Sequence, residues 1–194
     1  MTWAYLNNSF QKKDDVLISP YDRGFLFGDG VYELIPSYSG QMFLYDEHIS
    51  RLARSLEAVS IDKPQQWKNL ERIILDLLQR NKFHNQAVYI QVTRGQDKTR
   101  SHIPNETTAP TLFIESSELS ADLLQPNFTE PLLDVGMEED LRWSRCDIKA
   151  ITLLGNVMTL DKLSYGGLEE VIFFKDNLIT EGAKSNIFFV FGEE

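Results

Sequence analysis

Lys149 is a candidate for covalent chemistry because of its apolar neighbours. It stands between Ile148 and Ala150 in the stretch RCDIKAITLLGN. Lysine is seldom fully buried, and apolar surroundings disfavour the ammonium form of a lysine side chain. A neutral lysine amine is a nucleophile that can form an imine with a carbonyl compound. Two interpretations stay open: a lysine whose head reaches solvent, which the local sequence slightly favours, and a catalytic amine.

Imine chemistry on an amino acid needs an acid beside the cofactor ring and cations for a phosphate and a carboxylate. Glu181 ends an apolar run just before a glycine, and Arg51 lies beside the apolar stripe of a predicted helix, one turn after His48. Arg100 and His102 are two residues apart, so an extended loop points both in the same direction. Taken singly, Glu181 is more typical of a solvated turn and Arg51 of a helix surface, and a plain polar loop is the competing interpretation for Arg100 and His102.

Tyr32 alternates with Val31 and Glu33 directly after the Gly28-Asp29-Gly30 turn. On a strand, this alternation places Tyr32 on the face opposite to its two neighbours. Its hydroxyl is therefore a candidate for a pocket, and a core aromatic is the competing interpretation.

Composition excludes several classes of protein. The chain has 194 residues, and 29 acidic against 19 basic side chains give a net charge of −10, which argues against nucleic acid or an anionic membrane as partner. The single cysteine allows no internal disulfide and is typical of a cytoplasmic protein. No stretch approaches the ~18 apolar residues of a membrane span. The three histidines lack metal-ligand spacing, and no serine or cysteine lies in a nucleophile elbow, so neither a metalloenzyme nor a hydrolase is indicated.

The first half of the chain alternates between strand and helix patterns. Turn residues separate β-rich runs, and two segments carry apolar residues at helical spacing. The expected elements are strands over 2–6, 87–95 and 110–116, a hairpin over 30–45 turned at Ser39-Gly40, helices over 47–61 and 64–81, and a polar loop over 96–109.

The second half predicts a separate β-rich layer after a linker over 117–131. We expect a strand over 141–148, a helix over 155–165 and strands within 170–191 around an Asp176-Asn177 turn. The run Ile187 to Phe191 would need neighbouring strands that the chain does not supply, so this domain is expected to be incomplete. The predicted domains are 1–118 and 119–194 in an α+β protein.

Several separated motifs resemble one family. The stretches DRGFLFGDGVYE, EHISRLARSL, VYIQVTRG followed by RSHIP, LRWSRCDIKAITLLGN and ITEGAKSNIF occur in this order. Together they resemble the class IV, or fold type IV, aminotransferases that use pyridoxal 5'-phosphate, and most of all the D-amino-acid aminotransferases. The resemblance implies a small N-terminal α/β domain followed by a larger, β-rich C-terminal domain that binds the cofactor.

The resemblance also implies roles for the cofactor-binding residues. Lys149 matches the Schiff-base lysine, which also moves a proton during catalysis. Glu181 matches the carboxylate paired with the pyridine nitrogen, and Arg51 matches the arginine on the cofactor phosphate. Lys184 departs from the family pattern and is expected to place a charge close to Glu181.

Tyr32, Arg100 and His102 match the residues that bind the substrate carboxylate in the D-amino-acid branch, where the arginine and the histidine come from the partner subunit. The implied protein is a homodimer with shared active sites, which transfers an amino group from a D-amino acid, such as D-alanine, to a 2-oxo acid. Two alternatives within the family are an aminodeoxychorismate lyase and a branched-chain aminotransferase. A non-catalytic relative that acts as an interaction domain is the alternative outside it.

Overall fold

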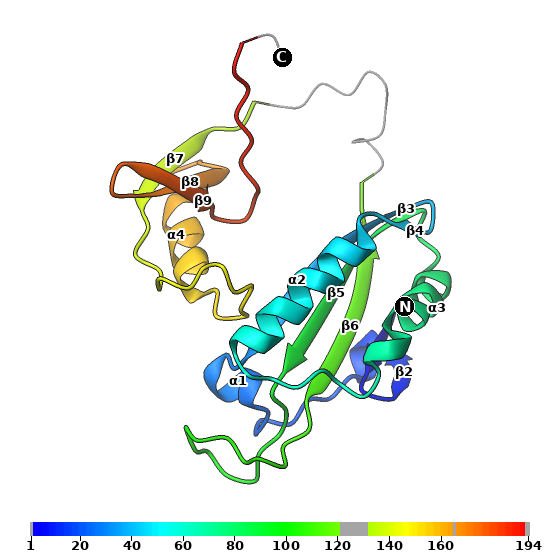
Figure 1. The fold of residues 1–194 in the computed structure, drawn as a ribbon. Coiled ribbons are helices and arrows are strands. Elements are labelled where there is room, and N and C mark those ends of the chain that lie inside the picture. The colour runs from blue at the N-terminus through cyan, green and yellow to red at the C-terminus, as the bar shows by residue number, and fades with distance from the viewer. Residues whose placement is uncertain (1, 121–131, 165, 193–194) are drawn as a thin grey trace. The chain divides into compact units, whose positions relative to one another are not determined.

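The computed structural model describes residues 2–120, 132–164 and 166–192 (Figure 1). The chain forms two compact units, of which the first combines Met1–Pro126 with the returning segment Cys146–Thr152. The second unit consists of Asn127–Arg145 and Leu153–Glu194. The domain boundary proposed at residue 118 stays a prediction, and most of the predicted linker, residues 121–131, lies outside the described residues.

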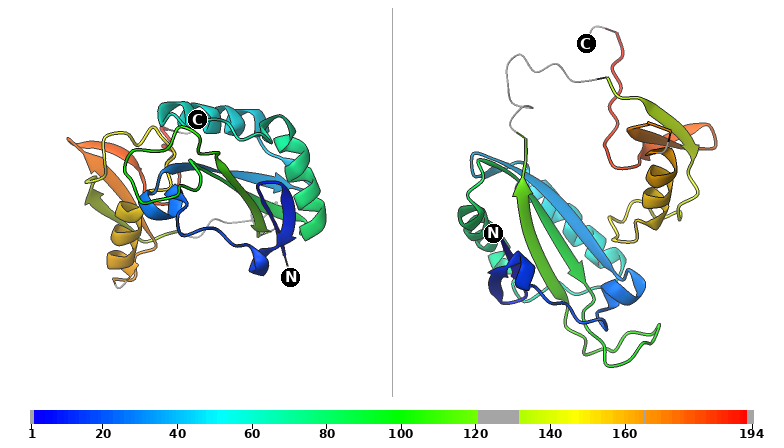
Figure 2. Two further views of the ribbon diagram at one scale, coloured as in Figure 1. Left: turned by 90° about the horizontal axis from the view of Figure 1, so that it is seen from below. Right: turned by 180° about the vertical axis from the view of Figure 1, so that it is seen from behind.

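The first unit is built on a six-stranded antiparallel sheet in the order β2-β1-β6-β5-β3-β4. Two helices, α2 and α3, cover one face of this sheet (Figure 2). The strands are β1 (Trp3–Leu6), β2 (Ser9–Lys12), β3 (Gly30–Tyr38), β4 (Gln41–Met42), β5 (Asn85–Thr93) and β6 (Thr111–Glu118); the long helices are α2 (Tyr45–Ala58) and α3 (Leu70–Asn81); short 3-10 turns occupy Lys13–Asp15 and Trp67–Asn69.

Two periodicities meet in the core of this unit. Every second residue of β3, β5 and β6 faces the helices, so Val31, Ile90 and Ile114 are fully buried. The helices contribute apolar residues at helical spacing to the same core, among them Leu52 and Ile74, which are also fully buried. Each such side chain contributes roughly 1.5–3 kcal/mol by burial.

A short helix, α1 (Arg23–Phe27), precedes β3 and was not predicted because five residues are too few for a periodic signal. The Asp22 carboxylate caps it by accepting a 2.8 Å hydrogen bond from the Gly24 amide. The helix ends at Gly28, whose φ of 66° is left-handed and where a Cβ would lie 2.3 Å from Thr152 Cγ2. Glycine is therefore required at the point where α1 meets the returning segment.

The returning segment runs along the edge of β3. The Tyr32 amide donates to the Lys149 carbonyl at 2.9 Å, and the Ile151 amide donates to the Gly30 carbonyl at 3.1 Å. Ile148, 6% exposed, packs into the core beneath. These contacts fix the backbone of Lys149 against the strand that carries Tyr32.

The second unit contains a three-stranded sheet and one helix. Strand β7 (Val135–Glu139) is parallel to β8 (Glu170–Lys175), which pairs antiparallel with β9 (Leu178–Gly182). Helix α4 (Leu154–Ser164) places Leu160 against Val171, Phe173 and Ala183. The predicted turn at Asp176 and Asn177 is confirmed, and both residues have the positive φ typical of a tight hairpin.

Two predicted strands are wrong. Residues 141–148 are irregular, because the Arg142 amide donates back to Asp140 Oδ1 at 3.1 Å and closes a local turn in place of a ladder. Residues 187–191 lie outside every strand of the described chain, and Phe188 and Phe191 are exposed. Both segments contain the apolar residues typical of strands, but such a pattern does not show which other strand they would pair with.

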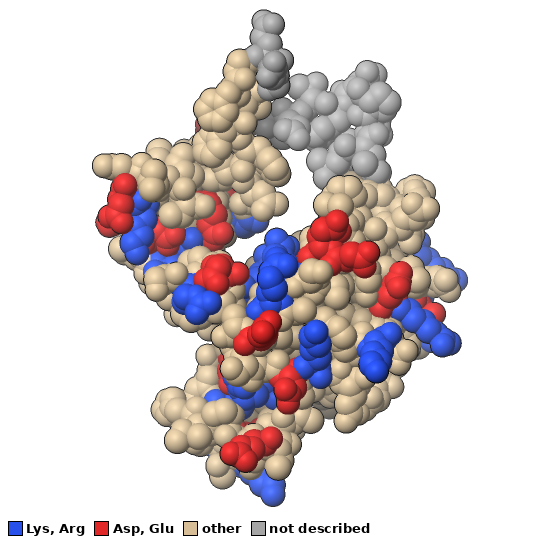
Figure 3. Space-filling model, viewed as in Figure 1, with Lys and Arg blue, Asp and Glu red and all other residues tan. Residues whose placement is uncertain are grey.

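Charge is dispersed over the face that carries α2. Figure 3 shows acidic and basic side chains interspersed there, with neither sign forming a continuous patch. Among the helices of the described residues, none is both long enough and apolar enough to cross a membrane.

Candidate active site

The Lys149 side chain lies over Tyr32. Its Nζ donates to the Tyr32 hydroxyl at 3.3 Å and stands 4.4 Å from the centre of the ring. Lys149 is half-buried, and no carboxylate of the described residues lies within ion-pair distance of its Nζ. The amine is thus held by a neutral hydroxyl and an aromatic face, which leaves it available for covalent chemistry.

Arg51 is fixed to β3 by a residue that the sequence predictions missed. Glu33, fully buried on β3, accepts hydrogen bonds from Arg51 Nε at 2.7 Å and from Nη2 at 2.5 Å. His48 Nδ1 lies 3.1 Å from the same carboxylate. An acidic residue at an inward-facing position of a strand was the signal that could have revealed this pair, because a buried carboxylate requires a partner.

The two charged groups stabilise each other's ionised forms. Burial by itself raises the pKa of Glu33, but hydrogen bonds from Arg51, the Leu34 amide and His48 bring that pKa below its ordinary value. The hydrogen bond to Glu33 raises the pKa of Arg51. A permanent cation on α2 therefore stands against Glu33, the strand neighbour of Tyr32.

Arg100 and His102 come together on one aromatic ring. The Arg100 guanidinium carbon lies 5.1 Å from the centre of the Phe27 ring, and the His102 ring centre lies 5.3 Å from it. Both residues are exposed on the loop between β5 and β6. Within the described part of the chain, their ring contacts are with Phe27 and not with Lys149, Tyr32 or Arg51. The predicted residues of this unit therefore form two separate groups.

Glu181 belongs to the second unit, where its cationic partner is Arg142. Arg142 Nη1 donates to Glu181 Oε1, and the same guanidinium donates to Asp140 from Nε at 2.9 Å and from Nη2 at 2.7 Å. Lys184 is exposed. The sequence predicts a charge near Glu181 from the adjacent turn, but the cation that contacts Glu181 comes from a residue 39 positions earlier.

Arg142 also lowers the pKa of Asp140 to about 2, chiefly through its side-chain hydrogen bonds. The guanidinium carbon stands 4.5 Å above the centre of the Phe173 ring, in the core of the second unit. Asn156, on α4, donates to the Ala183 carbonyl at 2.8 Å. Glu181 and its glycine turn are therefore held from both sides by polar contacts.

A family model described as "Amino-transferase class IV" matches residues 30–194. Among curated proteins, the D-alanine aminotransferase of Staphylococcus epidermidis is 34% identical over 190 residues, which cover 97% of this chain and 66% of the relative. The D-alanine aminotransferase of Listeria monocytogenes is 34% identical over 186 residues, with 94% and 63% covered. The chain thus spans slightly less than two thirds of the length of these relatives.

Solved structures share the fold at low sequence identity. A branched-chain aminotransferase from Thermoproteus uzoniensis, solved with norvaline, superposes with a TM-score of 0.79 at 16% identity over 94% of this chain and 63% of that chain. The PLP-bound form of a hypothetical aminotransferase from Mycobacterium tuberculosis has a TM-score of 0.77 at 18% identity, with 95% and 66% covered. These likenesses establish the fold.

Proposed function

Because the chain belongs to the class IV aminotransferase family, we propose that the protein catalyses pyridoxal-phosphate-dependent transfer of an amino group from a D-amino acid, such as D-alanine, to a 2-oxo acid. The observation that carries the proposal is the Lys149–Tyr32 contact, in which a half-buried amine lies against a hydroxyl. The D-alanine aminotransferases at 34% identity support a D-amino acid as the donor. The family resemblance and the α+β, two-unit fold predicted from the motifs agree with the family match.

The first unit contains one residue suited to the phosphate of pyridoxal phosphate, Arg51, and one suited to its aldehyde carbon, Lys149. Arg51 uses Nε and Nη2 for Glu33, and within the described residues no hydrogen bond occupies its Nη1, while its side chain is 43% exposed. A guanidinium has five N–H donors, so donors remain for a phosphate. Lys149 would attach the aldehyde carbon through its amine. When bound, the cofactor supplies an electron sink for the charge left on the substrate Cα.

The remaining steps belong to side chains of this chain. Lys149 Nζ would take the proton from Cα of the donor amino acid and deliver it to C4′ of the cofactor, and in the second half-reaction it would carry a proton from C4′ to Cα of the acceptor. The Tyr32 hydroxyl, 3.3 Å away, would orient that amine. Glu181, paired with Arg142, stays an acceptor suited to a protonated ring nitrogen.

Arg100 and His102 would bind the substrate carboxylate together with Tyr32. A guanidinium binds a carboxylate through two parallel hydrogen bonds, and a neighbouring imidazole adds a third donor. In the proposed homodimer, both side chains act in the partner subunit's active site. The low cysteine content keeps the cytoplasm as the expected compartment.

A coupled assay tests the proposal. The purified full-length protein, supplied with pyridoxal phosphate, D-alanine and 2-oxoglutarate, should form pyruvate and D-glutamate in equal amounts, and L-alanine should be a poor donor. Turnover of L-branched-chain amino acids in place of D-alanine would contradict the D-amino-acid assignment. Release of pyruvate from aminodeoxychorismate without an oxo-acid acceptor would select a lyase, and the absence of any turnover with the cofactor bound would select a non-catalytic relative.

A further inference from the structure

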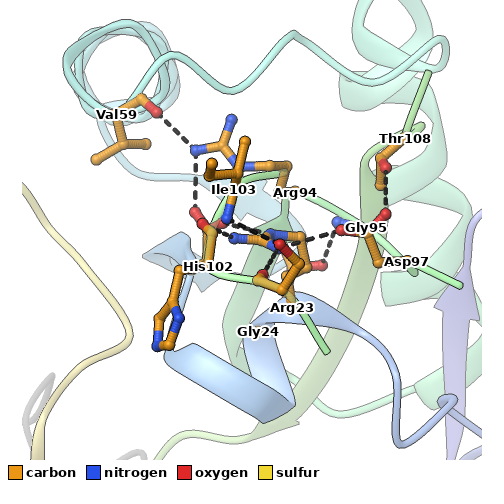
Figure 4. A network of polar contacts seen from close by, with 12 residues as sticks. Arg23, Gly24, Val59, Arg94, Gly95, Asp97, His102, Ile103 and Thr108 are labelled. Atoms are coloured by element: carbon orange, nitrogen blue, oxygen red, sulfur yellow. Dashed lines mark hydrogen bonds and ion pairs between the residues drawn. The ribbon is translucent and has the colours of Figure 1, made fainter. Parts of the chain in front are cut away.

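A buried arginine of α1 holds the loop that carries Arg100 and His102 (Figure 4). The Arg23 side chain is only 4% exposed. Its Nη1 donates to the Ser101 carbonyl at 2.7 Å, and its Nη2 donates to the His102 carbonyl at 3.0 Å. The guanidinium fork therefore fixes two consecutive carbonyls, one of them on His102 itself.

The charge of Arg23 is balanced by two carboxylates. Nε donates to Asp29 at 2.9 Å, and Nη1 donates to Asp97 at 3.1 Å. Asp97 stands at the start of the same loop and also accepts from the Thr108 hydroxyl, near the loop's end, at 3.2 Å. A buried cation must be paired, so these contacts leave Arg23 little freedom to move and tie both ends of the loop to its tip.

Phe27 extends this hold to the side chains. It follows Arg23 by one helical turn, so both residues lie on one face of α1. The ring that contacts Arg100 and His102 also lies 4.9 Å from the Arg23 guanidinium carbon. Arg23 fixes the loop backbone, and Phe27 supplies the surface on which the two side chains rest.

We propose that Arg23 is a positioning residue for substrate binding: through the Ser101 and His102 carbonyls, it sets the direction in which Arg100 and His102 present their donors to the substrate carboxylate. This inference rests on the proposed function. In this proposal, Arg23 does not contact the substrate itself and acts only through the loop that carries Arg100 and His102. Its effect is specific to affinity for the amino acid, because small displacements of donors weaken a two-point contact steeply.

Lysine cannot replace this arginine. An ammonium keeps the charge for Asp29 and Asp97, but it lacks the planar fork that reaches two carbonyls at once. Arg94 offers a matched control, because it also binds Asp29, at 2.8 Å and 3.0 Å, while it donates to the carbonyls of Val59 and Ser60, just after α2.

The test compares Arg23→Lys with Arg94→Lys in the cofactor-loaded, full-length enzyme. For Arg23→Lys, we expect the KM for D-alanine to rise about tenfold while kcat stays within about twofold, as for loss of one well-oriented charged contact. Arg94→Lys should lower the melting temperature and leave this KM unchanged. Phe27→Leu, which leaves the ion pairs intact, should raise the same KM and serves if Arg23→Lys folds poorly. An equal rise in KM for Arg94→Lys would overturn the inference.

A double-mutant cycle with Arg100→Ala separates positioning from general damage. If Arg23 acts through Arg100, adding Arg23→Lys to Arg100→Ala should raise KM by much less than it does in the wild type. Fully additive effects would overturn the inference. If Arg100→Ala raises KM and neither Arg23→Lys nor Phe27→Leu does, only the positioning role fails. If Arg100→Ala leaves KM unchanged, the proposed carboxylate site itself fails, and the positioning role fails with it.

Discussion

Glu33 on β3 and Arg51 on α2 form a two-point ion pair, with Nε and Nη2 of the arginine 2.7 Å and 2.5 Å from the two carboxylate oxygens. Glu33 is fully buried. It is the next residue after Tyr32, so a single step along the strand separates the hydroxyl that contacts Lys149 from the carboxylate that holds Arg51. One face of the strand thus carries the residue that contacts Lys149, and the other face carries the residue that holds Arg51.

This pair predicts a strong coupling between its two members. Arg51→Met should lower the unfolding free energy by about 2–3 kcal/mol, since it strips a buried carboxylate of its main donor while the arginine itself is partly exposed. The same substitution in a Glu33→Gln background should cost much less. Urea denaturation of the four proteins measures the coupling, and costs that simply add would contradict it.

Arg100 is predicted to act on affinity for the amino acid. Arg100→Ala removes a charge-assisted contact worth about 1.5–3 kcal/mol, which corresponds to a rise in KM of at least about tenfold. Initial-rate kinetics with D-alanine measure the effect. Lys98→Ala, a change of another exposed cation on the same loop, is the control and should leave KM near the wild-type value. A similar rise in both variants would contradict a specific role for Arg100.

Arg142, and not Lys184, is predicted to be the cation whose contact with Glu181 stabilises the second unit. Arg142→Met leaves Asp140 and Glu181 without this donor and should lower the unfolding free energy by about 1.5–3 kcal/mol. Lys184→Met, which removes the exposed charge in the adjacent turn, should change it by less than about 0.5 kcal/mol. Thermal and urea unfolding compare the two variants, and equal costs would mean that Lys184 shares the role.

The pKa of Asp140, lowered to about 2 from an ordinary 3.8, predicts a pH dependence of stability. Because the unfolded chain binds a proton more readily than the folded one, this carboxylate stabilises the fold above its ordinary pKa, and the contribution is lost as pH falls through its folded pKa. Between about pH 4 and pH 2, the unfolding free energy should therefore fall more steeply for the wild type than for Asp140→Asn. Parallel curves would contradict this contribution.

Much of the first unit could be predicted from periodicity. The hairpin turned at Ser39 and Gly40, the two long helices and the strands around the 96–109 loop are confirmed, because each buries one apolar face at a regular spacing. Helix α1 was not predicted because its ends are fixed by the Asp22 cap and by Gly28, and such single contacts leave no periodic pattern in the sequence. The strand predicted over 141–148 failed because Arg142 folds back onto Asp140.

The members of the candidate site stay predictions, which chemistry and family resemblance make from the sequence, whereas the residues that contact them come from the structure. Lys149, Tyr32 and Arg51 are three of these predicted residues, and their contacts lie at one end of β3. The partners Glu33 and Arg142 are set by tertiary contacts 18 and 39 residues apart in sequence, which no local pattern encodes. A buried acid on an apolar strand face is the one clue that sequence alone provides.

The central claim is that Lys149 holds the cofactor covalently, and borohydride trapping tests it most directly. The full-length protein is loaded with pyridoxal phosphate, reduced with borohydride to convert the lysine–cofactor imine into a stable amine, digested and analysed by mass spectrometry. We predict that the peptide containing Lys149 carries the reduced cofactor, and that Lys149→Ala loses both this mass increase and the visible absorbance of the bound cofactor. An unmodified Lys149 peptide, or undiminished absorbance in Lys149→Ala, would contradict the account.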